Sequence, residues 1–85
     1  MKVERKDKKI VCYLENKEVG YIDYSVNKVI TASFIYVNPE QRSTNAKDLL
    51  LEELMKMSNE LDLKINATCG YMNKFFTKKH PEYLV

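Results

Sequence analysis

Alternation of apolar and polar residues predicts three β-strands in the first half of the chain. The runs with this pattern, or with many β-branched and aromatic residues, lie at residues 8–14, 18–25 and 29–37. In the first run Ile10, Cys12 and Leu14 fall on one face. Short polar turns separate the runs, and Asn16 can adopt the positive φ that such a turn often needs. These features predict an antiparallel meander.

The apolar residues then recur with the period of a helix over residues 45–61. Their spacings of three and four place one face of the helix at Ala46, Leu50, Leu54, Met57 and Leu61. We expect Asn45 to cap this helix, with Asp48 in its first turn. So broad an apolar face is typical of a helix that packs on a sheet.

A fourth strand at residues 63–68 and a second helix at residues 71–79 complete the pattern. Gly70 separates them, and Pro81 stops the helix because proline disfavours helix in the residue before it. The long helix returns the chain to the sheet, so a right-handed crossover should place the fourth strand parallel to the third. The predicted fold class is α+β, in the order β-β-β-α-β-α, with a mixed sheet, one parallel pair and two helices.

Length and composition suit one small domain over residues 1–85. The net charge of +2 gives little support to nucleic-acid binding, and no apolar run is long enough for a membrane helix. The N-terminal lysines alternate with Glu4 and Asp7, so we expect a solvated tail or edge there. Cys12 and Cys69 lie far apart and cannot form a zinc site with the single His80. We therefore expect a reduced, cytoplasmic protein without a metal.

The segment from Val37 to Ala46 holds the main candidate chemistry. An apolar strand ends in a Pro-Glu turn, Arg42 and three small polar residues follow, and a helix then opens. The first amides of a helix have no partner within it, and the helix dipole makes that end positive, so a phosphate can bind there. Arg42 would add a donor fork suited to phosphate oxygens. The alternative is an ordinary connection between a strand and a capped helix.

This order and two motifs resemble the GNAT N-acetyltransferase superfamily, most closely its minimal single-domain GNAT-like (YjdJ-type) proteins. One motif is the run from Val37 to Arg42, which matches V-x-P-E-x-R before a phosphate-binding turn. The other begins at Cys69-Gly70-Tyr71 and ends in His80-Pro81-Glu82-Tyr83. The resemblance covers Gly20 to the C-terminus, and the two motifs fall on the expected elements.

The resemblance implies binding of acetyl-CoA, with CoA as the product, and transfer of the acetyl group to an amine acceptor that the sequence does not identify. Val37 would contact the pantetheine arm, and the phosphates would lie at Arg42, Ser43, Thr44, Asn45, Ala46 and Lys47. Tyr71 would protonate the leaving thiolate, and Cys69 would act as a nucleophile or line the acetyl site. For both residues, packing is the alternative role.

Several residues depart from the family pattern. Ser43 and Asn45 replace glycines, Lys47 replaces a small residue, and Asp48 brings a negative charge to the helix start. Phe34 stands where the relatives usually have a polar or basic residue. A second hypothesis is therefore a binding protein on the same scaffold, without acetyltransferase activity. A nucleic-acid-binding module is a third hypothesis, which rests only on lysines and tyrosines.

Overall fold

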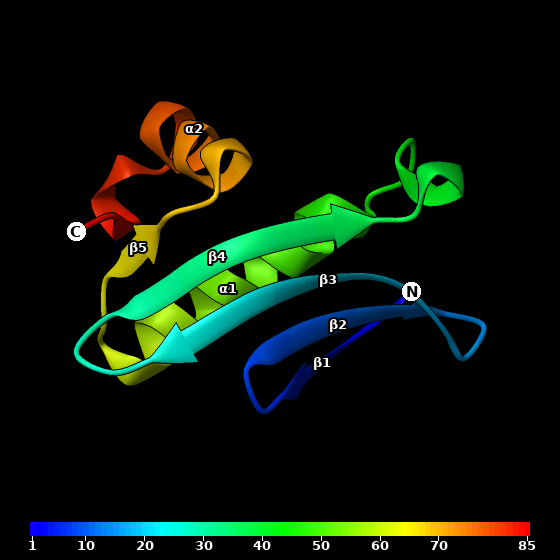
Figure 1. Cartoon of the computed structure of the whole chain (residues 1–85), viewed down its shortest axis with the longest axis horizontal. Coiled ribbons are helices and arrows are strands. Elements are labelled where there is room, and N and C mark those ends of the chain that lie inside the picture. Colours follow the sequence, from blue (N-terminus) through cyan, green and yellow to red (C-terminus); the bar gives the residue numbers. More distant parts are fainter.

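The computed structural model describes residues 1–85 and contains a five-stranded sheet and two α-helices (Figure 1). The strands are β1 (Lys2–Lys6), β2 (Lys9–Leu14), β3 (Lys17–Val26), β4 (Ile30–Val37) and β5 (Ile65–Ala67). The helices are α1 (Ala46–Leu61) and α2 (Gly70–Lys79), with short 3₁₀ turns η1 (Pro39–Gln41) and η2 (Pro81–Tyr83). The sheet order is β1-β2-β3-β4-β5, with only β4 and β5 parallel. The α+β class, the meander, the parallel pair and the two helices are confirmed.

The order differs from the prediction by one additional strand, β1. It pairs with β2 at the edge of the sheet, with Val3 opposite Cys12 and Arg5 opposite Ile10. Of the two alternatives for this segment, a tail or an edge, the edge is correct. The pattern of apolar residues did not reveal β1 because Val3 is its only apolar residue and the other four are charged, and pairing with β2 holds it in place. Lys8, at φ 66°, makes the tight turn between the two strands.

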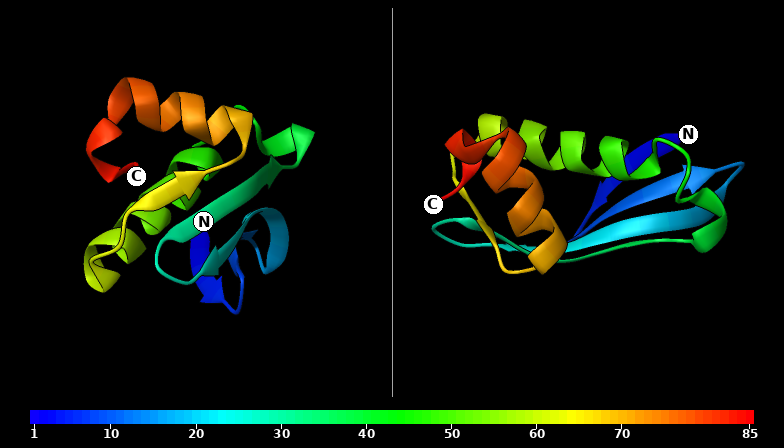
Figure 2. Two further views of the ribbon diagram at one scale, coloured as in Figure 1. Left: turned by 60° about the vertical axis from the view of Figure 1, so that its left-hand side comes forward. Right: turned by 90° about the horizontal axis from the view of Figure 1, so that it is seen from above.

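One core lies between the sheet and the helices. α1 runs along one face of the sheet, and α2 lies at the end where β5 pairs with β4 (Figure 2). The largest side chains that are fully buried there are Phe76, Ile10, Ile22, Ile30, Leu50, Leu54, Ile65 and Met72. No helix runs along the opposite face of β2 and β3 (Figure 2). The core therefore fixes both helices relative to β4, the strand that leads to the candidate site.

A β-bulge separates β4 from β5. Asp23 pairs with Phe34 and Tyr24 pairs with Ala32, so Ser33 has no partner in β3. The parallel pairing with β5 ends at the same place, with Ala32 opposite Ala67, and the Thr68 amide donates to the Ala32 carbonyl at 3.0 Å. A bulge bends its strand and increases the local twist. The parallel strands therefore splay apart toward Val37 and Cys69, as the resemblance implies.

Gly20 allows β3 and β4 to approach closely just before the candidate site. A Cβ atom at Gly20 would lie 2.7 Å from the carbonyl oxygen of Tyr36. A Cβ atom at Gly70, at the start of α2, would have no neighbour within 4 Å. Alanine substitutions at the two glycines therefore compare a crowded position with an open one.

We predict that Gly20→Ala destabilises the fold by about 1–3 kcal/mol, because the strands must move apart to admit the methyl group. Gly70→Ala should be neutral or stabilising, by up to about 1 kcal/mol. Urea unfolding of both variants and the wild type measures the difference. Equal stability of the Gly20 and Gly70 variants would contradict the close approach.

An ion-pair network ties the edge strand β1 to α1. Arg5 donates from Nε to Glu53 and from its two terminal nitrogens to Glu60, at 3.0 and 2.7 Å. The hydrogen bonds from Arg5 lower the pKa of Glu60, and the hydrogen bond to Glu60 is the main reason that the pKa of Arg5 is raised. The network therefore holds in place a strand that has little apolar surface of its own.

The sign of the Glu60 shift gives a pH dependence. Because its folded pKa lies below the ordinary value of 4.5, its contribution is present above that pH and is lost as the pH falls through the folded pKa. We predict that Arg5→Ala lowers the melting temperature at neutral pH, and that its difference from wild type narrows in acid. Thermal unfolding of wild type and variant at neutral pH and at acid pH tests this. The control is Lys2→Ala, which loses only an exposed ion pair to Glu4. A difference that does not change with pH would contradict the role of Glu60.

Candidate functional site

The splayed strands border a pocket of about 300 Å³. It is lined by Ile35, Tyr36, Val37, Arg42, Lys47, Cys69 and Tyr71. These residues come from the end of β4, the loop after it, the first turn of α1 and the start of α2. The structure thus brings together five of the residues that the sequence singled out. Ser43, Thr44 and Asn45, in the adjoining loop, and Ala46, the first residue of α1, do not line the pocket.

The backbone of that loop leaves amides free at the start of α1. The amides of Arg42 and Thr44 donate to the carbonyls of Pro39 and Gln41, and the amide of Ala46 donates to the Thr44 hydroxyl at 3.3 Å. The amides without an acceptor in the protein are those of Ser43, Asn45, Lys47 and Asp48. Unpaired amides at a helix start are the donors that an anion requires.

One expectation about this loop is corrected. The Asn45 side chain makes no capping bond; the Thr44 hydroxyl takes that role, accepting from Ala46 while it donates to the Gln41 carbonyl. Asn45 has φ −88°, and no residue of the loop has positive φ. The loop therefore does not need glycine at Ser43 or Asn45 to reach its conformation, and the two replacements matter only through their side chains.

Arg42 is anchored to the end of β4. Its Nε donates to the carbonyl of Val37 at 2.9 Å, and its guanidinium lies 5.9 Å from the centre of the Tyr36 ring. No hydrogen bond or ion pair within the protein engages its terminal nitrogens. The positively charged guanidinium of Arg42 is thus fixed in the loop that carries the free amides, and its terminal nitrogens remain available to donate hydrogen bonds.

Cys69 and Tyr71 form the opposite wall of the pocket. Cys69 is the partly buried residue just before α2, with extended backbone. Tyr71, in the first turn of α2, is 46% exposed, and the Lys47 ammonium lies 4.9 Å from its ring centre. This contact joins the starts of the two helices across the pocket. Cys12 lies apart in the core, where burial raises the pKa of its thiol.

Three residues of this region were not recognised from the sequence. Ile35 and Tyr36 line the pocket but looked like ordinary strand residues, and Ser33 forms the bulge. The only sequence signal for the bulge was Ser33 itself, a small polar residue within an apolar, β-rich run. Phe34, by contrast, belongs to the outer face of the sheet, where its ring lies 6.1 Å from that of Tyr21. Phe34 is not among the residues that line the pocket.

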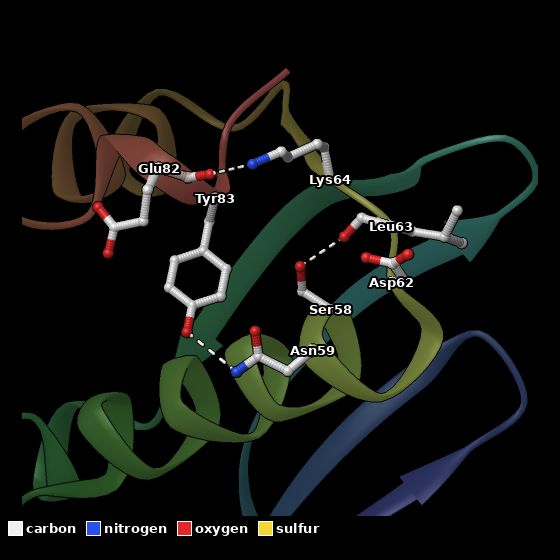
Figure 3. A pocket seen from close by; sticks show the side chains of 7 residues that line it. All are labelled: Ser58, Asn59, Asp62, Leu63, Lys64, Glu82 and Tyr83. Carbon is white, nitrogen blue, oxygen red and sulfur yellow. Dashed lines mark hydrogen bonds between the residues drawn. The ribbon is translucent and has the colours of Figure 1, made fainter.

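A second concavity, of about 280 Å³, lies between the end of α1, the start of β5 and η2 (Figure 3). Three of its polar side chains donate hydrogen bonds within the chain. Ser58 donates to the Leu63 carbonyl, Asn59 to the Tyr83 hydroxyl and Lys64 to the Glu82 carbonyl. None of the predicted site residues lines it. The bonds of Asn59 and Lys64 hold η2 against the end of α1 and the residue before β5, and we assign the concavity a structural role.

The structure has no group of three His, Cys, Asp or Glu residues arranged to hold a metal ion. Neither helix is long and apolar enough to cross a membrane.

Comparison with known families identifies the class of protein. Residues 9–85 match the family described as GCN5-related N-acetyl-transferase. The chain therefore belongs to the GCN5-related N-acetyltransferase family. No curated protein matches the sequence.

Solved structures share the fold. A GCN5-like protein from Staphylococcus aureus aligns with a TM-score of 0.75 and 21% identity, over 99% of this chain and 87% of that one. The aminoglycoside acetyltransferase meta-AAC0020, from an uncultured soil metagenomic sample, aligns with a TM-score of 0.72 and 16% identity, over 87% of this chain and 57% of that one. The aminoglycoside N-acetyltransferase AAC(6')-Iy, solved in complex with CoA, aligns with a TM-score of 0.65 and 14% identity, over 91% and 66%. At these identities the likeness concerns the fold, and the aminoglycoside enzymes are considerably longer than this chain.

Proposed function

We propose that the chain binds acetyl-CoA in the splay between β4 and β5 and transfers the acetyl group to an amine. The proposal rests on one observation: two sets of backbone groups without hydrogen-bond partners lie beside the same pocket. One is the edge of β4 beyond Ala32, which has no β5 partner. The other is the set of four free amides at the start of α1. Membership of the family and the CoA bound to AAC(6')-Iy support the choice of ligand.

The phosphates of the cosubstrate would lie at the start of α1. The free amides and the helix dipole would attract the pyrophosphate there, and the outer nitrogens of Arg42 and the Lys47 ammonium would add positive charge. Lys47 lies close enough to Tyr71 to reach across the pocket. Ser43 and Asn45 would contribute through their free backbone amides, whereas the amides of Thr44 and Ala46 and the Thr44 hydroxyl are already bonded within the loop.

The pantetheine arm would lie along β4. Successive residues of a strand direct their N–H and C=O groups to alternate sides, so the segment from Ser33 to Val37 presents such groups to the gap. Amide groups of the arm can pair with them as a short additional strand. The Val37 carbonyl already accepts from Arg42, and its second lone pair remains for the arm.

The proposed reaction is a direct transfer. The neutral amine nitrogen attacks the thioester carbonyl carbon, the N–C bond forms and the C–S bond breaks. Backbone amides of β4 next to the bulge would stabilise the negative oxygen of the tetrahedral intermediate. The departing thiolate would take a proton from Tyr71, and the nitrogen would release its extra proton to water. Cys69 would line the acyl site, since direct attack by the amine needs no enzyme nucleophile.

The second candidate function is a binding protein without acetyltransferase activity. Asp48 is the specific observation in its favour, because its carboxylate stands in the first turn of α1, where it would repel a pyrophosphate. The two hypotheses therefore differ in what they predict for this residue.

We predict that Asp48→Asn strengthens the binding of CoA while it weakens the helix. Loss of the acid at the helix start should cost about 0.3–1 kcal/mol of stability. Removal of its repulsion should raise CoA affinity, most visibly at low salt, where screening is least. Calorimetric titration of wild type and variant with CoA at two ionic strengths measures both the binding and its salt dependence.

Glu52→Gln, one turn further along α1 and exposed, is the matched control and should leave CoA affinity nearly unchanged. If Asp48→Asn changes only the stability, the helix start does not hold the pyrophosphate and the second candidate function is preferred.

We also predict that acetyl-CoA, which has no free thiol to consume the reagent, protects Cys69 from alkylation by iodoacetamide. Cys69 is partly accessible and lines the pocket, whereas Cys12 is fully buried and serves as an internal control. Mass spectrometry of the intact and digested protein would follow each thiol separately. Alkylation of Cys69 at the same rate with and without saturating acetyl-CoA would place the cosubstrate elsewhere.

A further inference from the structure

The exposed side of α2 carries a basic and aromatic strip. Its side chains share one helical face at spacings of three and four and are Tyr71, Lys74, Phe75, Lys78 and Lys79. The same five residues line a shallow pocket of about 200 Å³. Met72 and Phe76 anchor the opposite side of the helix in the core, so the strip faces outward.

The positive charges of the strip are not neutralised within the protein. No residue of α2 is acidic, and none of Lys74, Lys78 and Lys79 forms an ion pair. The nearest acid along the chain, Glu82, lies beyond the helix and is 3.5 Å from Nδ1 of His80. The Lys79 ammonium lies 5.6 Å from the centre of the Phe75 ring. The strip therefore combines an apolar floor with charge of a single sign.

The strip is continuous with the candidate site. Tyr71 lines both pockets, and Lys47 packs on its ring from the other side. A chain laid along α2 would thus lead directly to the wall that contains Cys69. This continuity distinguishes the strip from the scattered lysines of β1 and the turns.

We propose that the strip docks a short acidic segment of a polypeptide, and that this polypeptide is the acetyl acceptor. The acceptor role rests on the proposed function, whereas the docking does not. Carboxylates would pair with Lys74 and Lys78, and aliphatic parts of the segment would pack on Tyr71 and Phe75. A protein amine beside the acidic segment would then reach the pocket.

The dimensions favour a short peptide over nucleic acid. Residues 71 to 79 span roughly 12 Å of helix at 1.5 Å per residue, enough for only a few charged contacts. Tight nucleic-acid binding needs many phosphate contacts, and the rest of the chain supplies little net charge, since the total is +2. Carboxylates spaced along an extended segment match the few lysines that are present.

A fluorescence anisotropy assay without CoA tests the docking. The probe is a labelled peptide of alternating glutamate and glycine, and a glutamine-glycine peptide is its neutral match. Wild type should bind the glutamate peptide at low salt and not the glutamine peptide. Lys74→Glu with Lys78→Glu should weaken binding by about tenfold or more. The control, Lys17→Glu with Lys28→Glu, makes the same change in net charge at exposed positions outside the strip and should have little effect.

Three results would overturn the proposal. One is no binding of the glutamate peptide by wild type, or an equal loss in the control variant. Another is tighter binding of oligothymidylate than of the peptide, which would make the strip a nucleic-acid surface. The third is weaker binding of CoA by the Lys74/Lys78 variant with unchanged binding of dephospho-CoA, which would assign the strip to the 3′-phosphate of the cosubstrate. Because the peptide assay omits CoA, its outcome is independent of whether CoA binds in the pocket.

Discussion

The candidate site depends on a single break in backbone pairing at Ser33. Up to Ala32, β4 pairs on both sides, with β3 and with β5. At Ser33 the register with β3 shifts, and from there β4 keeps its β3 partner but loses β5. A buried strand edge without partners is costly, because each unpaired N–H or C=O loses its hydrogen bond. Such an edge persists where a ligand or water can satisfy it, and here it borders the pocket.

The same break determines where the helices begin. Since β4 continues past β5, the chain enters α1 from the far end of β4 and enters α2 from the end of β5. The two helix starts therefore lie on either side of the gap, close enough for Lys47 to pack on Tyr71. Gly20 contributes from the other side of β4 by allowing β3 to hold it closely. These constraints produce a groove whose mouth lies beside the positive ends of two helices. Such a groove suits a long anionic thioester better than a compact neutral ligand.

Much of this arrangement could be predicted from the sequence, because it has local causes. The alternation around Ile10 and the period from Ala46 to Leu61 identified the strands and the long helix. The motifs at Val37 and Cys69 identified both walls of the pocket. What could not be predicted depends on contacts distant in sequence. β1 exists because β2 offers an edge and α1 offers Glu53 and Glu60 to Arg5.

Loop detail was also beyond the sequence. Asn45 is the better capping residue by type, but the 3₁₀ turn at η1 places the Thr44 hydroxyl at the first helical amide instead. Serine and asparagine in place of the family's glycines would distort the loop only if its backbone were left-handed. No residue of the loop adopts that conformation. The relevant departure from the family pattern is thus the charge of Asp48.

The central claim is that the unpaired edge of β4 and the start of α1 form one binding site for an acyl-CoA. Amide chemical shifts of ¹⁵N-labelled protein, followed during titration with CoA, test it most directly. The account predicts that the perturbed amides fall in two groups, at residues 33–37 and 43–48, and that they saturate together. Shifts confined to the concavity around Ser58 and Tyr83, or no shifts at saturating CoA, would contradict it.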